Sequence, residues 1–72
     1  MNEVKILLRD INGAWKELAG SREEVYKKLC VDVVENASTE EEIMLVSVDD
    51  MLLFNSLTMD SIDKEDLLGF LA

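Results

Sequence analysis

Residues 3–19 read EVKILLRDINGAWKELA, and the fold class depends on whether this stretch is one helix or two strands. Apolar residues recur mostly at steps of three and four, which is typical of one helix face: Val4, Leu7, Leu8, Ile11, Trp15 and Leu18. Asn12-Gly13 is a competing signal, because this dipeptide favours a two-residue hairpin turn between strands. A glycine inside a helix costs only about 1 kcal/mol. The apolar stripe therefore favours a helix over 3–19.

The next segment carries a helix start signal. Gly20 suits the end of a helix, and Ser21 and Glu24 are spaced for reciprocal capping of free amides. Val25 and Leu29 then recur at a helical interval. The sequence predicts a second helix over 22–36.

Residues 40–57 contain two overlapping start signals. Thr39 with Glu42 would begin a helix at residue 40. Ser47 followed by two acids is a later signal, with Val46 and Met51 spaced as a hydrophobic staple. A third helix therefore spans either 40–57 or 48–57, and in the second case residues 40–46 are a short helix, a loop or an extended segment.

The last segment is a stapled helix start. Asp63 can cap, Asp66 lies near the positive end of the helix dipole, and Ile62 is spaced to contact Leu67. A helix over 64–71 follows. We therefore expect an all-α protein, a small bundle of three or four short helices in a single domain spanning 1–72.

The charge is concentrated in the second half of the chain. Residues 1–36 carry seven acids and six bases, whereas residues 37–72 carry nine acids and only Lys64, giving a net charge of −9 overall. Such a surface repels phosphates, which excludes direct nucleic-acid binding, and attracts basic protein surfaces. The expected partner is a protein with a basic surface.

Little in the sequence supports chemistry or membrane insertion. The chain has no His and a single Cys30, and its carboxylates lack the spacing of a calcium loop. We therefore expect neither an enzyme nor a metal site. No apolar run reaches the roughly 18 residues that span a bilayer. The lone cysteine also favours a reducing compartment, so a cytoplasmic location without membrane contact is expected.

One stretch resembles a known family. The segments from Glu23 to Leu29 and from Val48 to Asp63, which includes Asp60-Ser61-Ile62, resemble an acyl or peptidyl carrier protein over about residues 22–68. The resemblance implies 4'-phosphopantetheine attached to Ser61. The alternative is that the protein has no cofactor and that Ser61 only precedes the helix that Asp63 caps.

The preferred interpretation is a small acidic protein-binding module, such as a regulator, inhibitor or assembly factor. It would act through apolar helix faces and the acidic C-terminal half, and its excess apolar surface would be shared with a partner or in a homodimer. The candidate contact residues are Asp49, Asp50, Met51, Phe54, Glu65 and Asp66. Two alternatives are the carrier protein with Ser61 modified and a DNA mimic that inhibits a DNA-binding protein.

Overall fold

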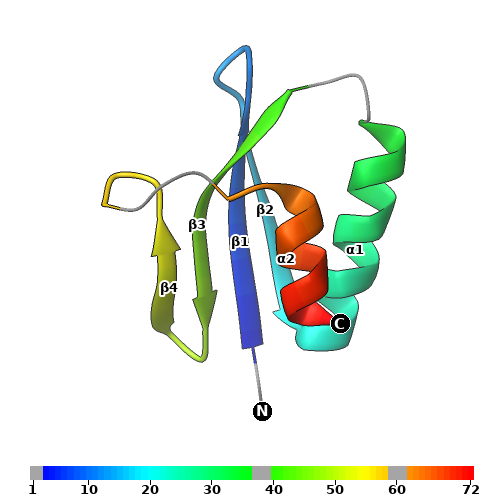
Figure 1. Cartoon of the computed structure of the whole chain (residues 1–72), viewed down its shortest axis with the longest axis vertical. Coiled ribbons are helices and arrows are strands. Elements are labelled where there is room, and N and C mark those ends of the chain that lie inside the picture. The colour runs from blue at the N-terminus through cyan, green and yellow to red at the C-terminus, as the bar shows by residue number, and fades with distance from the viewer. Residues whose placement is uncertain (1–2, 37–39, 59–61) are drawn as a thin grey trace.

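A computed structural model describes residues 3–36, 40–58 and 62–72 of the chain. Within these residues it contains four strands and two helices (Figure 1). The strands form one antiparallel sheet in the order β2-β1-β3-β4. The prediction of an all-α bundle is therefore wrong.

Residues 3–19 form a β-hairpin and not the predicted helix. Strand β1 (Glu3–Asp10) pairs with β2 (Trp15–Ser21), and the predicted helix is absent from this part of the described chain. Asn12-Gly13 lies in the connecting turn, where Gly13 has a φ of +85°. The Asp10 carboxylate accepts the amide N–H groups of Asn12 and Ala14, both at 2.9 Å. The hairpin alternative is therefore correct, although the connection spans residues 11–14 and is longer than the two-residue turn that Asn12-Gly13 favours.

Helix α1 (Arg22–Glu35) confirms the predicted second helix and its start. The Ser21 hydroxyl accepts the amide N–H of Glu24 at 3.2 Å, which is one of the two hydrogen bonds of the predicted reciprocal pair. Val25 and Leu29 point into the core from this helix. The cap is a local interaction, so sequence spacing alone located it.

Residues 40–57 also differ from the prediction of a helix. They form strands β3 (Glu41–Val48) and β4 (Met51–Asn55) instead of a helix. Asp49 and Asp50 form the two-residue turn between them, with φ values of 53° and 64°. Positive φ at both central residues is the requirement of a type I′ hairpin turn, and Asp tolerates this conformation better than most residues. The two acids that resembled part of a helix start form the hairpin turn between β3 and β4.

Helix α2 (Lys64–Leu71) confirms the last predicted helix. The Asp63 carboxylate accepts the amide N–H of Asp66 at 3.1 Å, which is the expected cap. Leu67 and Leu71 are the buried residues of this helix. The structure thus keeps the predicted caps of α1 and α2, while strands replace the other two predicted helices.

The helices pack on one side of the sheet and leave β4 at its far edge (Figure 1). Alternate residues of a strand point to opposite faces, and those of β1 that face the helices are buried. One core joins the sheet to both helices: Val4, Ile6, Leu8, Leu18, Val25, Leu29, Ile43, Val46, Phe54, Leu67 and Leu71. The opposite face of the sheet carries no covering element among the described residues.

Candidate protein-binding edge of the sheet

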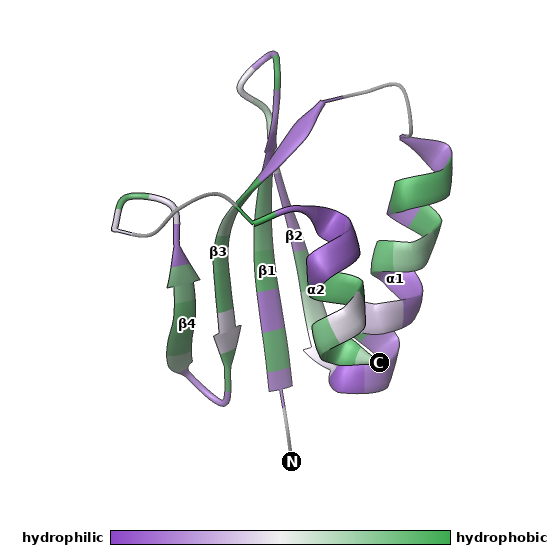
Figure 2. Ribbon diagram, viewed as in Figure 1, coloured by the Kyte–Doolittle hydropathy of each residue, from purple (hydrophilic) through white to green (hydrophobic). Residues whose placement is uncertain are grey.

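Strand β4 is an apolar edge strand with little cover. Met51 is 68% exposed, Leu52 54% and Leu53 41%. Figure 2 shows β4 as a largely hydrophobic strand that begins after a hydrophilic turn. Because β4 pairs only with β3 among the described strands, its other edge has peptide groups that are free to pair with a further strand.

The turn before β4 is fixed to the start of β1. The amide N–H of Asp49 donates to the carbonyl oxygen of Glu3 at 2.8 Å, and the Asp49 carboxylate accepts the amide N–H of Glu3 at 2.9 Å. Val48 and Met51 flank the two-residue turn and are paired in register. In such a hairpin the flanking residues bond to each other, so the peptide groups of the next residue, Leu52, point away from β3.

The exposed side chains of β4 lie on both faces of the sheet. Leu52 pairs with Ser47, on the face opposite the helices, whereas Met51 pairs with Val48 on the helix side. On the helix side a shallow pocket of about 210 Å³ lies beside the strand. Its lining includes Val48, Met51, Leu53 and Phe70. A strand added to β4 would therefore find apolar surface on each side of its backbone.

Arg22 holds the end of α2 beside this pocket. Its Nε donates to the carbonyl oxygen of Leu71 at 3.2 Å, and its Nη2 donates to the carbonyl oxygen of Phe70. The guanidinium carbon also lies 5.3 Å from the centre of the Phe70 ring. These contacts satisfy carbonyl groups at the end of a helix and keep the half-exposed Phe70 ring at the pocket.

The opposite edge of the sheet is protected by charge. Strand β2 carries Lys16 and Glu17, and Lys28 of α1 donates from Nζ to the carbonyl oxygen of Ala19 at 3.1 Å. Charged side chains and covered peptide groups are the usual means by which edge strands avoid pairing with other chains. The two edges thus differ in kind, and β4 is the one suited to accept a strand.

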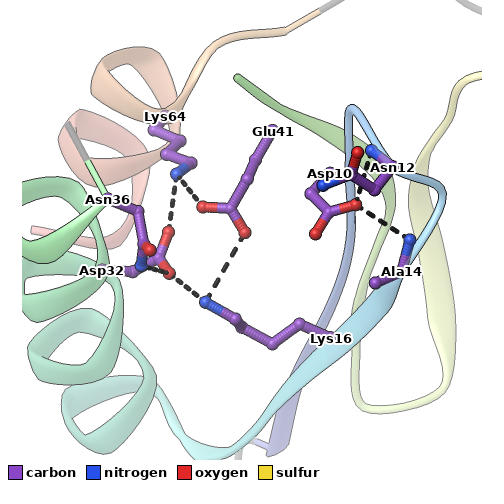
Figure 3. A network of polar contacts seen from close by, with 8 residues as sticks. All are labelled: Asp10, Asn12, Ala14, Lys16, Asp32, Asn36, Glu41 and Lys64. Carbon is purple, nitrogen blue, oxygen red and sulfur yellow. Dashed lines mark hydrogen bonds and ion pairs between the residues drawn. The ribbon is translucent and has the colours of Figure 1, made fainter. Parts of the chain in front are cut away.

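A partly buried ion-pair network connects the two helices to the sheet (Figure 3). Asp32 of α1, with a side chain only 4% exposed, accepts from Lys16 of β2 and from Lys64 of α2, the latter at 2.6 Å. Glu41 of β3 accepts from Lys64 at 2.6 Å and lies 3.5 Å from Lys16. The Asn36 side-chain amide donates to Asp32 at 2.8 Å.

Charge pairing shifts the pKa values in this network. Burial alone would raise the pKa of Asp32, but hydrogen bonds from Lys16 and Lys64 outweigh it and lower that pKa to about 2. The hydrogen bond to Asp32 raises the pKa of Lys16. Burial opposes the charge of Lys64, yet its bonds to Asp32 and Glu41 raise its pKa as well. Paired acids and bases that stay charged in this way hold elements together and are poor proton donors or acceptors at neutral pH.

The structure brings together three of the six predicted contact residues. Asp49, Asp50 and Met51 lie consecutively and exposed at the β3–β4 turn. Phe54 belongs to the core with 5% exposure, so its side chain offers little surface to a partner. Its ring faces the helix side of the sheet, opposite Val46.

The other two, Glu65 and Asp66, form a separate acidic group at the start of α2. Figure 1 places this start about level with the far end of β4, away from the β3–β4 turn. A hydrogen bond with Asp63 raises the pKa of the fully exposed Asp66. Ser61, the predicted phosphopantetheine site, lies outside the described residues, so that role stays a prediction.

The sequence did not single out Leu52 and Leu53 among the candidate contact residues, and it did not predict the ion-pair network. The apolar run from Met51 to Phe54 was visible, but on a helix its residues would have fanned over several faces. The network joins pairs of residues that are separated by 16, 23 and 32 positions along the chain. Local sequence patterns carry no signal for contacts at such separations.

Two further findings concern metals and membranes. In residues 3–36, 40–58 and 62–72, no group of three His, Cys, Asp or Glu side chains is placed to hold a metal ion. Neither α1 nor α2, the helices of the described chain, is long and apolar enough to cross a bilayer.

Comparisons with models of protein families, with curated proteins and with solved structures found no match for this chain.

Proposed function

We propose that this chain is a small acidic protein-binding module, and that it binds an extended segment of another protein chain along the edge of β4. The exposed apolar edge strand is the observation that carries the proposal. Addition of a strand to a free sheet edge is a common mode of peptide recognition, in which main-chain hydrogen bonds supply affinity and alternate side chains supply specificity.

The surroundings of β4 favour a specific contact. The turn is fixed to Glu3 by two hydrogen bonds, so the edge is presented on a rigid element. Leu52 on one face and Met51 and Leu53 on the other offer side-chain contacts above and below an added strand. A regulator, inhibitor or assembly factor would use such an edge without any catalytic group.

If the partner has a basic surface, the acids near this edge are the groups that would bind it. Asp50 is exposed at the turn and accepts no hydrogen bond within the described part of the chain, so it is free to meet a partner. Asp49 is engaged with Glu3, which makes it a poorer choice for a charge test. The Asp50→Lys variant is expected to weaken binding to a basic partner, whereas Glu23→Lys, on the exposed side of α1, is the matched control.

Site-specific photo-crosslinking tests the proposal. A photoreactive residue replaces Leu52 in one variant and Val34 in a control, since Val34 is exposed and apolar but lies on α1. The proposal predicts a defined adduct from position 52, mapped by mass spectrometry to an extended segment of the captured chain. Equal capture from both positions, or capture from position 34 alone, would refute it.

A further inference from the structure

We infer that the chain bound at the β4 edge is a second copy of this protein, with β4 pairing antiparallel to β4. This inference rests on the part of the proposed function that places a bound strand at the β4 edge, and it names an acidic copy of this chain as the partner in place of a basic protein surface. It begins from the asymmetry between the two edges of the sheet, because β2 is guarded by Lys16, Glu17 and Lys28 while β4 is not.

The charge along the edge favours a second copy over a basic strand. Residues 51–58 read MLLFNSLT and contain no charged side chain, although the whole chain has a net charge of −9. A basic strand lying along these residues would lose hydration of its charges without finding carboxylates beside it. An uncharged apolar strand is the best complement, and β4 is itself such a strand.

The position of the acids selects the antiparallel orientation. Asp49 and Asp50 lie at one end of β4, and the uncharged residues 56–58 lie at the other. Antiparallel pairing places each acidic turn beside the uncharged end of the other copy. Parallel pairing would place the two turns side by side. Repulsion between the remaining charges is largely screened beyond about 8 Å at physiological salt.

Pairing through β4 also closes the assembly. A two-fold interface uses the same surface of each copy, so both β4 edges are consumed and both guarded β2 edges remain outside. The product is a dimer with a continuous sheet of eight strands, twice the four of one copy. A further copy finds no unguarded strand edge within the described residues.

The apolar side chains around β4 supply the rest of the interface. A standard interface buries about 800 Å² of each partner, roughly a sixth of the 4984 Å² of this chain. Five backbone positions do not cover that area, so side chains beside the strand must take part. Leu52 on one face, Met51, Leu53 and Phe70 on the other, and the 88% exposed Leu57 are placed to do so.

Sedimentation equilibrium of the full chain tests the inference. The 8.2 kDa chain is expected to sediment at twice that mass at micromolar concentration. Leu52→Lys is expected to weaken dimerisation at least tenfold, and Val34→Lys is expected to leave the dissociation constant unchanged within about twofold. Far-UV circular dichroism of each variant confirms that it is folded.

A second variant isolates the backbone contribution. Chemical synthesis can place N-methyl leucine at position 52, which removes the outward N–H and keeps the side chain. If two β4 strands pair, this variant must also dimerise more weakly, because one main-chain hydrogen bond per copy is lost. A wild-type protein that stays monomeric at millimolar concentration overturns the inference, and so does a dimer unaffected by both changes at position 52.

The outcomes separate this inference from the proposed function. A monomeric protein whose photoreactive residue 52 captures a different protein chain would overturn the second-copy inference and support the proposed function. A monomeric protein with no capture at position 52 would overturn both. A dimer that crosslinks copy to copy through position 52 supports both.

Discussion

Asp32 is a carboxylate that would be unstable in its position without its neighbours. Burial of a charge costs several kcal/mol unless it is paired and hydrogen-bonded. Lys16, Lys64 and Asn36 supply those partners from two other elements and from the end of its own helix. Asp32 thereby links α1 to β2 and to α2, and the strength of this link depends on pH.

The lowered pKa of Asp32 predicts an acid-sensitive contribution to stability. Its pKa is about 2 in the folded protein against 3.8 ordinarily, so the contribution is complete above about pH 4 and is lost as pH falls toward 2. We expect the difference in free energy of unfolding between wild type and Asp32→Asn to shrink by about 2 kcal/mol over this range. Urea titrations at several pH values measure it.

The exposed Glu35→Gln on the same helix is the control for that experiment. Its difference from wild type should change little with pH, because a solvated carboxylate contributes little to stability. A gap between wild type and Asp32→Asn that stays constant down to pH 2 would show that the ion pairs do not hold Asp32 charged.

Asp50 carries a conformational cost at the turn. Its φ of 64° lies in the left-handed region, which costs a residue with a Cβ about 1 kcal/mol, although Asp pays less than most. Asp50→Gly relieves that cost but raises the conformational entropy of the unfolded chain, which offsets part of the gain. We expect a net rise of about 0.5 kcal/mol in the free energy of unfolding, measured by urea denaturation.

Asp50→Asn separates charge from conformation in that test. Asn tolerates the left-handed region as Asp does and removes the negative charge. If Asp50→Asn stabilises as much as Asp50→Gly, relief of charge repulsion and not backbone conformation explains the gain.

At the scale of elements, β4 has one side chain in the core and three exposed apolar side chains. Phe54→Ala is expected to lower the free energy of unfolding by about 3 kcal/mol, because a buried ring is replaced by a cavity. Leu52→Ala should change the stability of the monomer by less than about 0.5 kcal/mol. Both values are measured by denaturation at concentrations where the protein is monomeric.

Equal losses from these two substitutions would contradict the placement of β4. They would mean that Leu52 is also buried in the monomer, and the edge would then not be available to another chain.

The elements that sequence predicted correctly are those with local signals. Ser21 caps α1 and Asp63 caps α2, and each bonds to an amide three residues away. The strands depend on distant partners, as when Ile6 of β1 lies between Leu18 of β2 and Val46 of β3. The sequence of residues 3–19 is compatible with both helical and alternating patterns, and cross-strand pairing decides between them.

The candidate site was predicted in part for the same reason. The acidic turn and Met51 were found because they are adjacent in sequence, whereas the role of Phe54 depends on which face of a strand it occupies. Strand residues alternate between two faces, whereas helix residues do not. The prediction of a helix over 48–57 therefore did not separate the buried Phe54 from the exposed Leu52. The acids at Glu65 and Asp66 lie away from the turn because they begin α2, which packs beside α1 (Figure 1).

At the scale of the whole molecule, the sheet has an edge strand with charged side chains, β2, and an apolar edge strand, β4. A chain of 72 residues buries a modest fraction of its surface, so an apolar edge strand is a costly feature to leave in water. Coverage of β4 by another chain would remove that cost. The same contact would extend the sheet and use the apolar surface on both of its faces.

The most direct test is an NMR measurement on an equimolar mixture of isotope-labelled and unlabelled protein, which detects contacts between copies alone. The account predicts such contacts between β4 of one copy and β4 of the other, including the methyl groups of Leu52 and Leu53. Contacts between copies that involve β2 or α1 and spare β4, or none at millimolar concentration, would contradict it.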